Sequence, residues 1–432
     1  MRRRTARALV ATGAAILCAE LFGLGAFYVD TGGLFYTHSK TYEDLLPAPE
    51  DRLVLGEAVH PYFGFTHRPG AAFDIPASLR SPGAAPARLT TNNFGFVSPH
   101  DFPFGKTGDR QFLLGIFGGS VAVWFCQIGA PRLVEDLQKQ PLFRDREIVP
   151  LCFSHEGYKQ PQEALVLAYF LSIGQTFDLV LNIDGFNDVA LGALNSTRGF
   201  EFSMPSLQHL DPLISVVNQS ALTPEKLDLL AAIFRDRRRL TELAGTIGAN
   251  SLASVNFVLD RYYAIVRDRY VRELGRFNGL PSNPVENAFV QMAKPTDTRE
   301  RGALFTEIAA VWARASRLMH TELAERRVPY LHVLQPNQYA TARRFGPEEA
   351  KVALSDASPY RKDAEEGYPA LLRAAASTLV QEKWFVDATH VFDRVPAPVY
   401  MDNCCHYTRL GNEVLADFIA DSIASTPGPW RP

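Results

Sequence analysis

Ser120 is the residue of this chain whose setting is best suited to nucleophilic chemistry. It follows Gly118 and Gly119, which end an apolar run that begins at Phe112. Because glycine tolerates a sharp chain reversal, we predict a buried strand, a tight turn and then a helix. The serine hydroxyl would lie exposed at the strand end, close to a helix N-terminus that favours negative charge. Taken alone, such a stretch more often marks a turn whose serine only caps the helix.

A serine hydroxyl is a poor nucleophile unless a base takes its proton, and His406 is the candidate base. Asp402 lies on the same short loop. A carboxylate there can fix the tautomer of the imidazole and stabilise its charged form. Asn403 or a backbone carbonyl is the alternative support for the ring, and we favour Asp402.

Cysteines and further histidines raise the question of a metal centre. Cys404 and Cys405 stand beside His406, but we find no second, spaced pair of ligands of the kind that zinc sites use. We therefore expect neither a metal nor an organic cofactor. We expect His155 to be structural or to line the substrate site, and His332, inside a predicted strand, to be a satisfied core histidine.

From residue 111 onward, apolar strands alternate with helical stretches. Strands are predicted at 111–117, 147–152, 178–183, 329–334 and 384–388, and helices at 121–138, 162–173, 304–325, 369–380 and 410–423. This alternation indicates an α/β fold, a three-layer sandwich with a mostly parallel central sheet. Active groups then collect at the carboxyl ends of the strands. Ser120, Gly157 and Asn187 all fall just past such ends and would share one rim.

Two regions depart from this alternation. Residues 31–110 are rich in Pro, Gly, Phe and Asn and predict a small β-rich lead-in, which we expect to be a structural cover rather than a carbohydrate-binding surface. Residues 190–300 predict a helical insertion or lid, with one helix starting at Thr223-Pro224 and another covering 253–274. Its interspersed arginines favour a solvated face, with membrane lipid or an anionic polymer as the alternative.

Residues 1–30 predict a membrane anchor. Four arginines precede a mostly apolar run, 8–29, which is about long enough to cross a bilayer. The charge asymmetry places the N-terminus in the cytoplasm and the remainder outside the inner membrane. Glu20 within the run is a cost that one helix can tolerate. The alternative is a cleaved signal peptide and a secreted protein.

Composition narrows the remaining possibilities. The chain has 432 residues, 47% hydrophobic and 21% charged, which fits one large domain or two ordinary ones. A net charge of −3 argues against a nucleic-acid partner. Five cysteines do not make a disulfide scaffold. One bridge could form among Cys126, Cys152, Cys404 and Cys405, but the sequence does not assign it.

Four short blocks resemble those of the SGNH (GDSL-like) hydrolases. In chain order they are Gly118-Gly119-Ser120, Gly157, Gly185-Phe186-Asn187-Asp188 and Asp402 to His406. The resemblance covers about residues 110–425, giving a hydrolase-like domain at 111–425 with the insertion at about 190–300. The third block is similar to that of a membrane-anchored bacterial branch.

This resemblance implies a role for each block. Ser120 would be the nucleophile, with Asp402 and His406 completing a catalytic triad. The oxyanion hole would combine the backbone amides of Ser120 and Gly157 with the side-chain amide of Asn187. Gly157 suits this role because the backbone there must approach the substrate closely. Asp188 is expected to order the loop around Asn187.

The sequence departs from the family pattern at two positions. Gly119 stands where the family has an aspartate before the serine, so a side chain that shapes the turn is missing. The family usually places its aspartate three residues before the histidine, a position that Asn403 holds here, and Asp402 is four before. One extra loop residue would account for this spacing.

The expected function is acyl transfer through an acyl-serine intermediate. The substrate would be an acylated carbohydrate or a small ester, with O-acetyl groups of a cell-envelope polysaccharide as the family-level expectation and water or a sugar hydroxyl as acceptor. One alternative is a lipid esterase or thioesterase, with the insertion as an interfacial lid. The other is a catalytically inactive polysaccharide-binding or assembly protein on the same fold.

Overall fold

The computed structural model describes residues 2–39, 45, 57–75, 79, 88–214, 223–280, 290, 292–295, 297–379 and 382–425. The chain divides into two compact units. Unit 1 comprises Met1–Leu55 and Ser215–Val290, and unit 2 comprises Gly56–Ile214 and Gln291–Pro432. The long helices of the predicted insertion therefore group with the N-terminal segment, and the lead-in from residue 56 onward groups with the α/β region.

Five parallel strands form the central sheet of unit 2. They are β5 (Gln111–Gly118), β6 (Glu147–Ser154), β7 (Leu179–Asp184), β8 (Tyr330–Leu334) and β9 (Phe385–Asp387). Their order across the sheet is β6-β5-β7-β8-β9, and every neighbouring pair is parallel. β5, β7 and β8 are buried along their whole length, which is why they read as near-continuous apolar runs. The structure confirms the predicted α/β class with a parallel central sheet.

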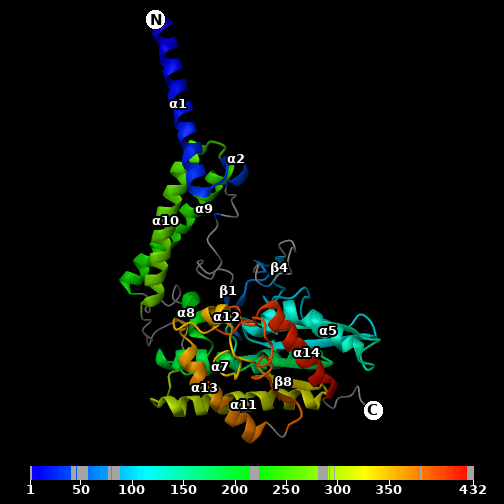
Figure 1. The fold of residues 1–432 in the computed structure, drawn as a ribbon. Helices are drawn as coiled ribbons and strands as arrows, with labels where there is room; N and C mark the ends of the chain where they lie inside the picture. The colour runs from blue at the N-terminus through cyan, green and yellow to red at the C-terminus, as the bar shows by residue number, and fades with distance from the viewer. Residues whose placement is uncertain are drawn as a thin grey trace. The chain divides into compact units, whose positions relative to one another are not determined.

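Two groups of helices accompany this sheet. In one group α5 (Ala130–Lys139) packs against α14 (Arg409–Ser425). In the other, α11 (Arg301–Glu325) packs against three helices: α6 (Gln162–Ser172), α7 (Phe186–Thr197) and α13 (Arg361–Thr378). Figure 1 shows α14 and α11 with strand β8 between them. The shorter helices are α4 (Ser120–Trp124), α8 (Leu207–Ile214) and α12 (Pro347–Ala353).

A π-helical turn, Phe125–Gly129, separates α4 from α5. Pro131 lies in the first turn of α5 and has no amide hydrogen to donate to the turn before it. Cys126 of the π turn forms a disulfide with Cys152 of β6, across a Cα–Cα distance of 6.2 Å. The helix that starts at Ser120 is thereby tied to a strand beside β5.

The described residues of the lead-in contribute two pairs of antiparallel strands to unit 2. β1 (Glu57–His60) pairs with β2 (Gly64–His67), and β3 (Ala72–Asp74) pairs with β4 (Arg88–Thr90). Four phenylalanines of this region are at most 2% exposed: Phe63, Phe65, Phe96 and Phe102. The hydroxyl of Tyr158 donates to the carbonyl of Phe65 at 2.8 Å. These aromatic side chains therefore pack into the interior.

Unit 1 is helical in its described residues. It contains α1 (Arg2–Thr31), α2 (Phe35–His38), α9 (Pro224–Ala249) and α10 (Ala253–Gly279). α9 packs along α10 through a shared apolar core that includes Ile233, Leu240 and Tyr270. The hydroxyl of Thr223 accepts the backbone N–H of Lys226, which is the cap that the sequence predicts.

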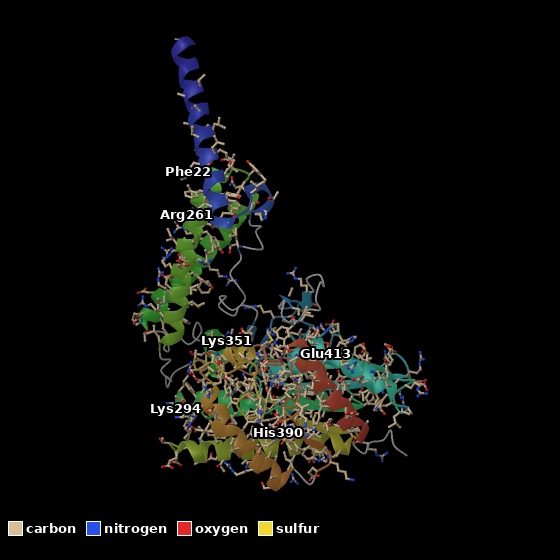
Figure 2. All side chains as sticks on the ribbon, viewed as in Figure 1. Phe22, Arg261, Lys294, Lys351, His390 and Glu413 are labelled. Carbon is tan, nitrogen blue, oxygen red and sulfur yellow. A yellow bond between two sulfur atoms is a disulfide. The ribbon has the colours of Figure 1, made fainter. Side chains whose placement is uncertain are left out.

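α1 also packs against α10 within unit 1. Phe22 meets Phe257 edge to face at 5.4 Å, and Arg261 pairs with Asp30 at 3.2 Å; Figure 2 marks Phe22 and Arg261 where these helices adjoin. The segment Val10–Thr31 is long and apolar enough to span a membrane. One such helix near an N-terminus fits a membrane anchor and a signal sequence alike.

Several helices differ from the prediction. α13 begins at Arg361, eight residues before the expected start, and carries Pro369 inside it. The flanking Tyr368 and Leu371 are fully buried, so tertiary packing outweighs the local cost of proline. α7 was not predicted as a helix, although its first turn carries Asn187. α8 and α12 were not predicted either.

Candidate active site

Ser120, His406 and Asp402 form one continuous chain of hydrogen bonds. His406 Nδ1 lies 2.5 Å from Asp402 Oδ2, and His406 Nε2 lies 2.8 Å from Ser120 Oγ. A carboxylate only accepts, so in the neutral ring Nδ1 carries the hydrogen and Nε2 can accept from the serine hydroxyl. The structure thus brings together the three residues that the sequence nominated as nucleophile, base and orienting carboxylate.

The loop geometry explains the four-residue spacing between Asp402 and His406. Tyr400 and Tyr407 form a bridge that closes a tight loop. Inside it, Asp402 Oδ1 accepts the backbone N–H groups of Cys404, Cys405 and His406 at 2.9, 3.0 and 3.2 Å. One carboxylate oxygen therefore folds the loop, while the other contacts the imidazole.

Asn403 does not support the imidazole. Its backbone carbonyl instead accepts from the hydroxyl of Tyr339 at 2.7 Å and from that of Ser358 at 2.6 Å. Gln338 and Asn337 donate side-chain N–H groups to the carbonyls of Asp402 and Cys404. The segment after β8, which sequence reasoning did not connect with the site, thus holds the loop of the base in place.

Two glycines make the turn at Ser120 possible. Gly118 has φ +140, and a Cβ there would lie 2.2 Å from the carbonyl oxygen of Ile183 on β7. A Cβ on Gly119 would lie 2.2 Å from Nδ2 of Asn187. The space that a side chain at 119 would occupy is therefore filled by the amide of Asn187.

Of the three expected oxyanion-hole residues, Ser120 and Asn187 lie at this turn, and Gly157 directly precedes Tyr158, whose carbonyl accepts the Asn187 amide. Ser120 is the first residue of α4, where backbone N–H groups have no partner within the helix. Asn187 donates to the carbonyl of Tyr158 at 2.8 Å, which fixes its side chain beside Gly119. Gly157 has φ +77, and a Cβ there would lie 2.3 Å from the ring of His209. The structure thus gives two reasons for glycine at 157, its backbone conformation and the His209 ring, and neither is the close approach to a substrate that the sequence led us to expect.

Asp188 holds the segment that leads to α6, whereas we expected it to order the loop around Asn187. Its Oδ1 accepts the backbone N–H of Gln160 at 2.9 Å, and the residue is 3% exposed. Burial and the nearby charge of Asp184 raise the pKa of Asp188.

Strand order explains why these residues meet. The chain passes from β5 outward to β6 and then returns across β5 to β7. Ligand crevices in open α/β sheets form at such a reversal, outside the carboxyl ends of the strands. Ser120 follows β5 and Asn187 follows β7, so both lie at this reversal point.

The electrostatics favour a charged imidazole. Burial opposes charge on the ring, but the hydrogen bond and the charge of Asp402 raise the pKa of His406 to about 9. Burial also opposes ionisation of Asp402, yet the contacts with His406 and the backbone amides hold the pKa of this carboxyl below its usual value. The pair therefore stabilises the imidazolium that a serine nucleophile generates.

The other candidate ligand residues have partners of their own. The sulfur atoms of Cys404 and Cys405 lie 3.2 Å apart beside His406. Both ring nitrogens of His406 are already bonded, one to Asp402 and one to Ser120, so a metal bound to this histidine would break one of those hydrogen bonds. His332 is fully buried and contacts Ser316 and Asp184, each at 2.6 Å, which confirms the prediction of a satisfied core histidine.

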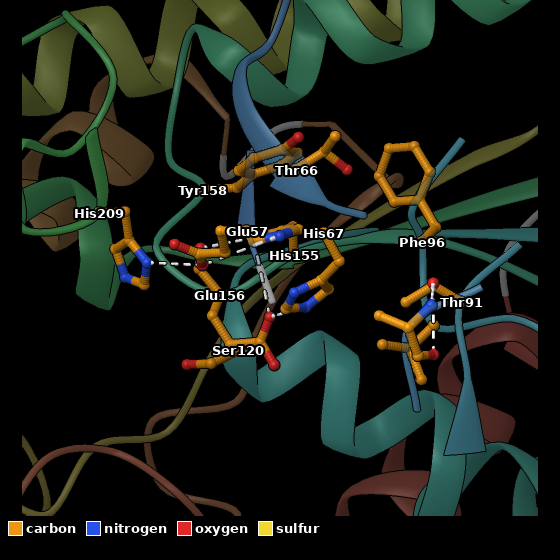
Figure 3. A network of polar contacts seen from close by, with 12 residues as sticks. Glu57, Thr66, His67, Thr91, Phe96, Ser120, His155, Glu156, Tyr158 and His209 are labelled. Carbon is orange, nitrogen blue, oxygen red and sulfur yellow. Dashed lines mark hydrogen bonds and ion pairs between the residues drawn. The ribbon is translucent and has the colours of Figure 1, made fainter. Parts of the chain in front are cut away.

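His155 belongs to a second cluster of histidines and carboxylates next to Gly157. Glu57, His67, Glu156 and His209 join it there, as Figure 3 shows. Burial and the nearby charge of His67 lower the pKa of His155 to about 4. Sequence reasoning singled out only His155: Glu156 is its neighbour in the chain, whereas Glu57, His67 and His209 lie far from it in the sequence.

Comparison with known proteins adds no identification: no family model matches this chain, and no curated protein is significantly similar to it.

Proposed function

We propose that this protein is a serine ester hydrolase or acyl transferase of the SGNH type. The observation that carries the proposal is the Ser120–His406–Asp402 hydrogen-bond chain at the reversal point of a parallel sheet, with Asn187 beside the nucleophile. The four sequence blocks that resemble the SGNH hydrolases supply residues to this one place.

The chemistry proceeds in two halves. His406 takes the proton of Ser120 as the hydroxyl oxygen attacks the acyl carbonyl, and Asp402 stabilises the imidazolium. The amides of Ser120, Gly157 and Asn187 face the developing oxyanion, and each such donor typically contributes about 10²–10³ in rate. His406 returns the proton to the leaving alcohol, which yields an acyl-serine. Water or a sugar hydroxyl then attacks that ester with His406 again as base.

The proposed substrate is an O-acylated carbohydrate of the cell envelope. An N-terminal helix able to span the inner membrane and a disulfide between Cys126 and Cys152 both fit an extracytoplasmic domain. Acetyl is the acyl group that we propose. This step rests on fold-level analogy and is the part of the proposal that substrate assays decide.

Hydrolysis of p-nitrophenyl esters by the detergent-solubilised full chain tests the proposal. We expect activity on the acetyl ester that falls to background in Ser120→Ala. Ser172→Ala is the matched control, because that exposed hydroxyl only donates to the carbonyl of Tyr169. A preference for long acyl chains would favour a lipid esterase.

Labelling with a fluorophosphonate probe separates an enzyme from an inactive binding protein. We expect labelling of the folded chain that is lost in Ser120→Ala and retained in Ser172→Ala. Absence of labelling, together with no Ser120-dependent activity on any ester with or without a sugar acceptor, would overturn the enzymatic proposal.

A further inference from the structure

A second constellation of side chains in unit 2 has the composition of a metal site. Glu57 and His67 lie on the β1–β2 hairpin, and His155 directly follows β6. Each offers one ligand atom, and these atoms all lie within 4.8 Å of one another. The three residues are between 0 and 6% exposed. Figure 3 shows them drawn together beside Glu156.

His155 presents a lone pair to this constellation. Its Nδ1 lies 2.9 Å from the carbonyl oxygen of Glu156, which only accepts, so Nδ1 carries the ring hydrogen. Nε2 of the neutral ring therefore holds a lone pair. Within the described part of the chain this buried atom has no hydrogen-bond partner, and it faces Glu57 Oε1 at 3.9 Å. A lone pair opposite a carboxylate oxygen is repulsive unless a cation lies between them.

Glu57 presents a second such atom. Its Oε1 contacts Nδ1 of His209 at 3.0 Å, whereas its Oε2 is buried without a hydrogen-bond partner among the described residues. Burying an ionised carboxylate is costly unless it is paired or coordinates a metal. Glu57 Oε1 therefore faces the unpartnered Nε2 of His155, and the other oxygen of the same buried carboxylate has no hydrogen-bond partner among the described residues.

His67 completes a recognisable ligand arrangement. Its Nε2 lies 2.9 Å from the carboxylate of Glu156. Metal-bound histidines commonly use one ring nitrogen for a carboxylate or a carbonyl, which orients the other toward the ion. His155 holds its ring against a carbonyl and His67 against a carboxylate, so both imidazoles have the supporting contact that a ligand needs.

We propose that Glu57, His67 and His155 bind a divalent transition metal, with Zn²⁺ as the best fit. Two imidazoles and one carboxylate suit zinc, whereas Mg²⁺ and Ca²⁺ prefer all-oxygen sites. A tetrahedral centre with bonds of about 2.1 Å holds its ligand atoms roughly 3.4 Å apart. The three atoms must therefore draw together by about 1 Å on binding.

The metal would act on the loop that follows β6. It would join the β1–β2 hairpin to His155, two residues before Gly157. If the proposed ester chemistry holds, the ion would position the Gly157 amide for the oxyanion without contacting the ester. This consequence rests on the proposed function, whereas metal binding itself does not depend on it.

Direct metal binding tests the site. Tag-free full chain would be stripped with a chelator and titrated with Zn²⁺ against a chromophoric competitor, with metal content measured by mass spectrometry. We expect one tight site per chain, and an affinity weaker by roughly 100-fold or more in Glu57→Gln and in His155→Gln. Co²⁺ in place of Zn²⁺ should give the visible absorption bands of a tetrahedral centre.

Three control variants make the result specific. His390→Gln removes an exposed imidazole and should leave binding unchanged. A Cys404→Ser, Cys405→Ser double variant should also retain the metal, because the other candidate cluster is not the site. Ser120→Ala should retain it too, which separates this proposal from the ester chemistry.

Two outcomes would overturn the proposal. One is a stripped, folded wild-type chain that takes up neither Zn²⁺ nor Co²⁺ and whose thermal midpoint does not rise with either ion. The other is tight binding that survives both Glu57→Gln and His155→Gln or that is lost with Cys404 and Cys405. The wild-type measurement remains decisive if a ligand variant fails to fold.

Discussion

At the scale of single residues, the contact between Gly119 and Asn187 couples two sequence blocks. A Cβ at 119 would lie 2.2 Å from the Asn187 amide nitrogen and 3.1 Å from the carbonyl of Tyr158. That carbonyl also accepts the Asn187 amide. Any larger residue at 119 must therefore displace the side chain that we propose as an oxyanion donor.

Gly119→Ala should lower ester turnover by about 10²–10³, the usual cost of losing one oxyanion donor. Asn187→Ala should cost a similar factor, and the double variant should be little worse than either, because both remove the same interaction. Steady-state kinetics on p-nitrophenyl acetate measure all three. Gly105→Ala is the control, since a Cβ there meets nothing within 4 Å. Fully additive losses would contradict the coupling.

The raised pKa of His406 predicts an alkaline activity profile. The base must be neutral to take the proton of Ser120, so kcat/KM should rise with pH, reach half of its plateau near pH 9 and level off at higher pH. In Asp402→Asn the rising limb should move to lower pH, because the charge that raises the pKa is gone, and the plateau should fall by up to about 10⁴. Asp393 pairs with the exposed His390, which is not part of the triad. Asp393→Asn is therefore the control and should change neither the position of the rising limb nor the height of the plateau.

The same shift has a consequence for stability. The folded pKa of His406 lies above its ordinary value of 6.5. Its contribution to the free energy of unfolding is therefore fully present below about pH 6.5 and is lost as the pH rises through about 9. If the rise of kcat/KM with pH were the same in Asp402→Asn as in the wild type, Asp402 would not set the pKa of His406.

At the scale of elements, the N-terminus of α10 explains a charge inside the candidate membrane span. Glu20 of α1 accepts the backbone N–H groups of Ala253 and Ser254 at 2.6 and 3.1 Å, and the Ser254 hydroxyl at 2.7 Å. The first turn of a helix has free N–H groups and a partial positive charge. The sequence showed Glu20 only as a cost, whereas the structure shows it capping a helix.

Glu20→Ala should destabilise unit 1 by about 1 kcal/mol, since it removes the side chain that caps α10. Limited proteolysis of the detergent-solubilised chain, with cleavage between 223 and 280 as the readout, measures this opening. Glu242→Ala, at an exposed position of α9, is the control. Equal proteolysis of the two variants would show that the contact contributes nothing.

At the scale of the whole molecule, the candidate span predicts how the protein partitions in a cell. If α1 remains uncleaved, the chain should stay with membranes through alkaline extraction, and added protease should digest it only after the outer side of the inner membrane is exposed. Deleting residues 1–31 should release the chain. Release of the full-length product as a shortened soluble protein would instead establish signal cleavage.

The elements nearest the site were predictable because their signals are local. The apolar runs of β5 and β7 and the glycines after them are contiguous in the sequence. A parallel sheet then places their carboxyl ends on one edge. The starts of two helices were harder to predict. The residue that precedes α7 is Gly185, which has no side chain to cap the helix, and α13 continues through Pro369 because packing outweighs propensity.

By itself, the sequence determined the α/β class, the apolar N-terminal helix and the residues that meet at the carboxyl edge, because these follow from periodicity and from residues adjacent in the chain. Only the tertiary structure decided that Asp402 rather than Asn403 supports His406, and that Asn187 fills the space beside Gly119. It also assembled Glu57, His67 and His155. Contacts between residues far apart in the chain depend on packing geometry, which residue types and their spacing do not encode locally.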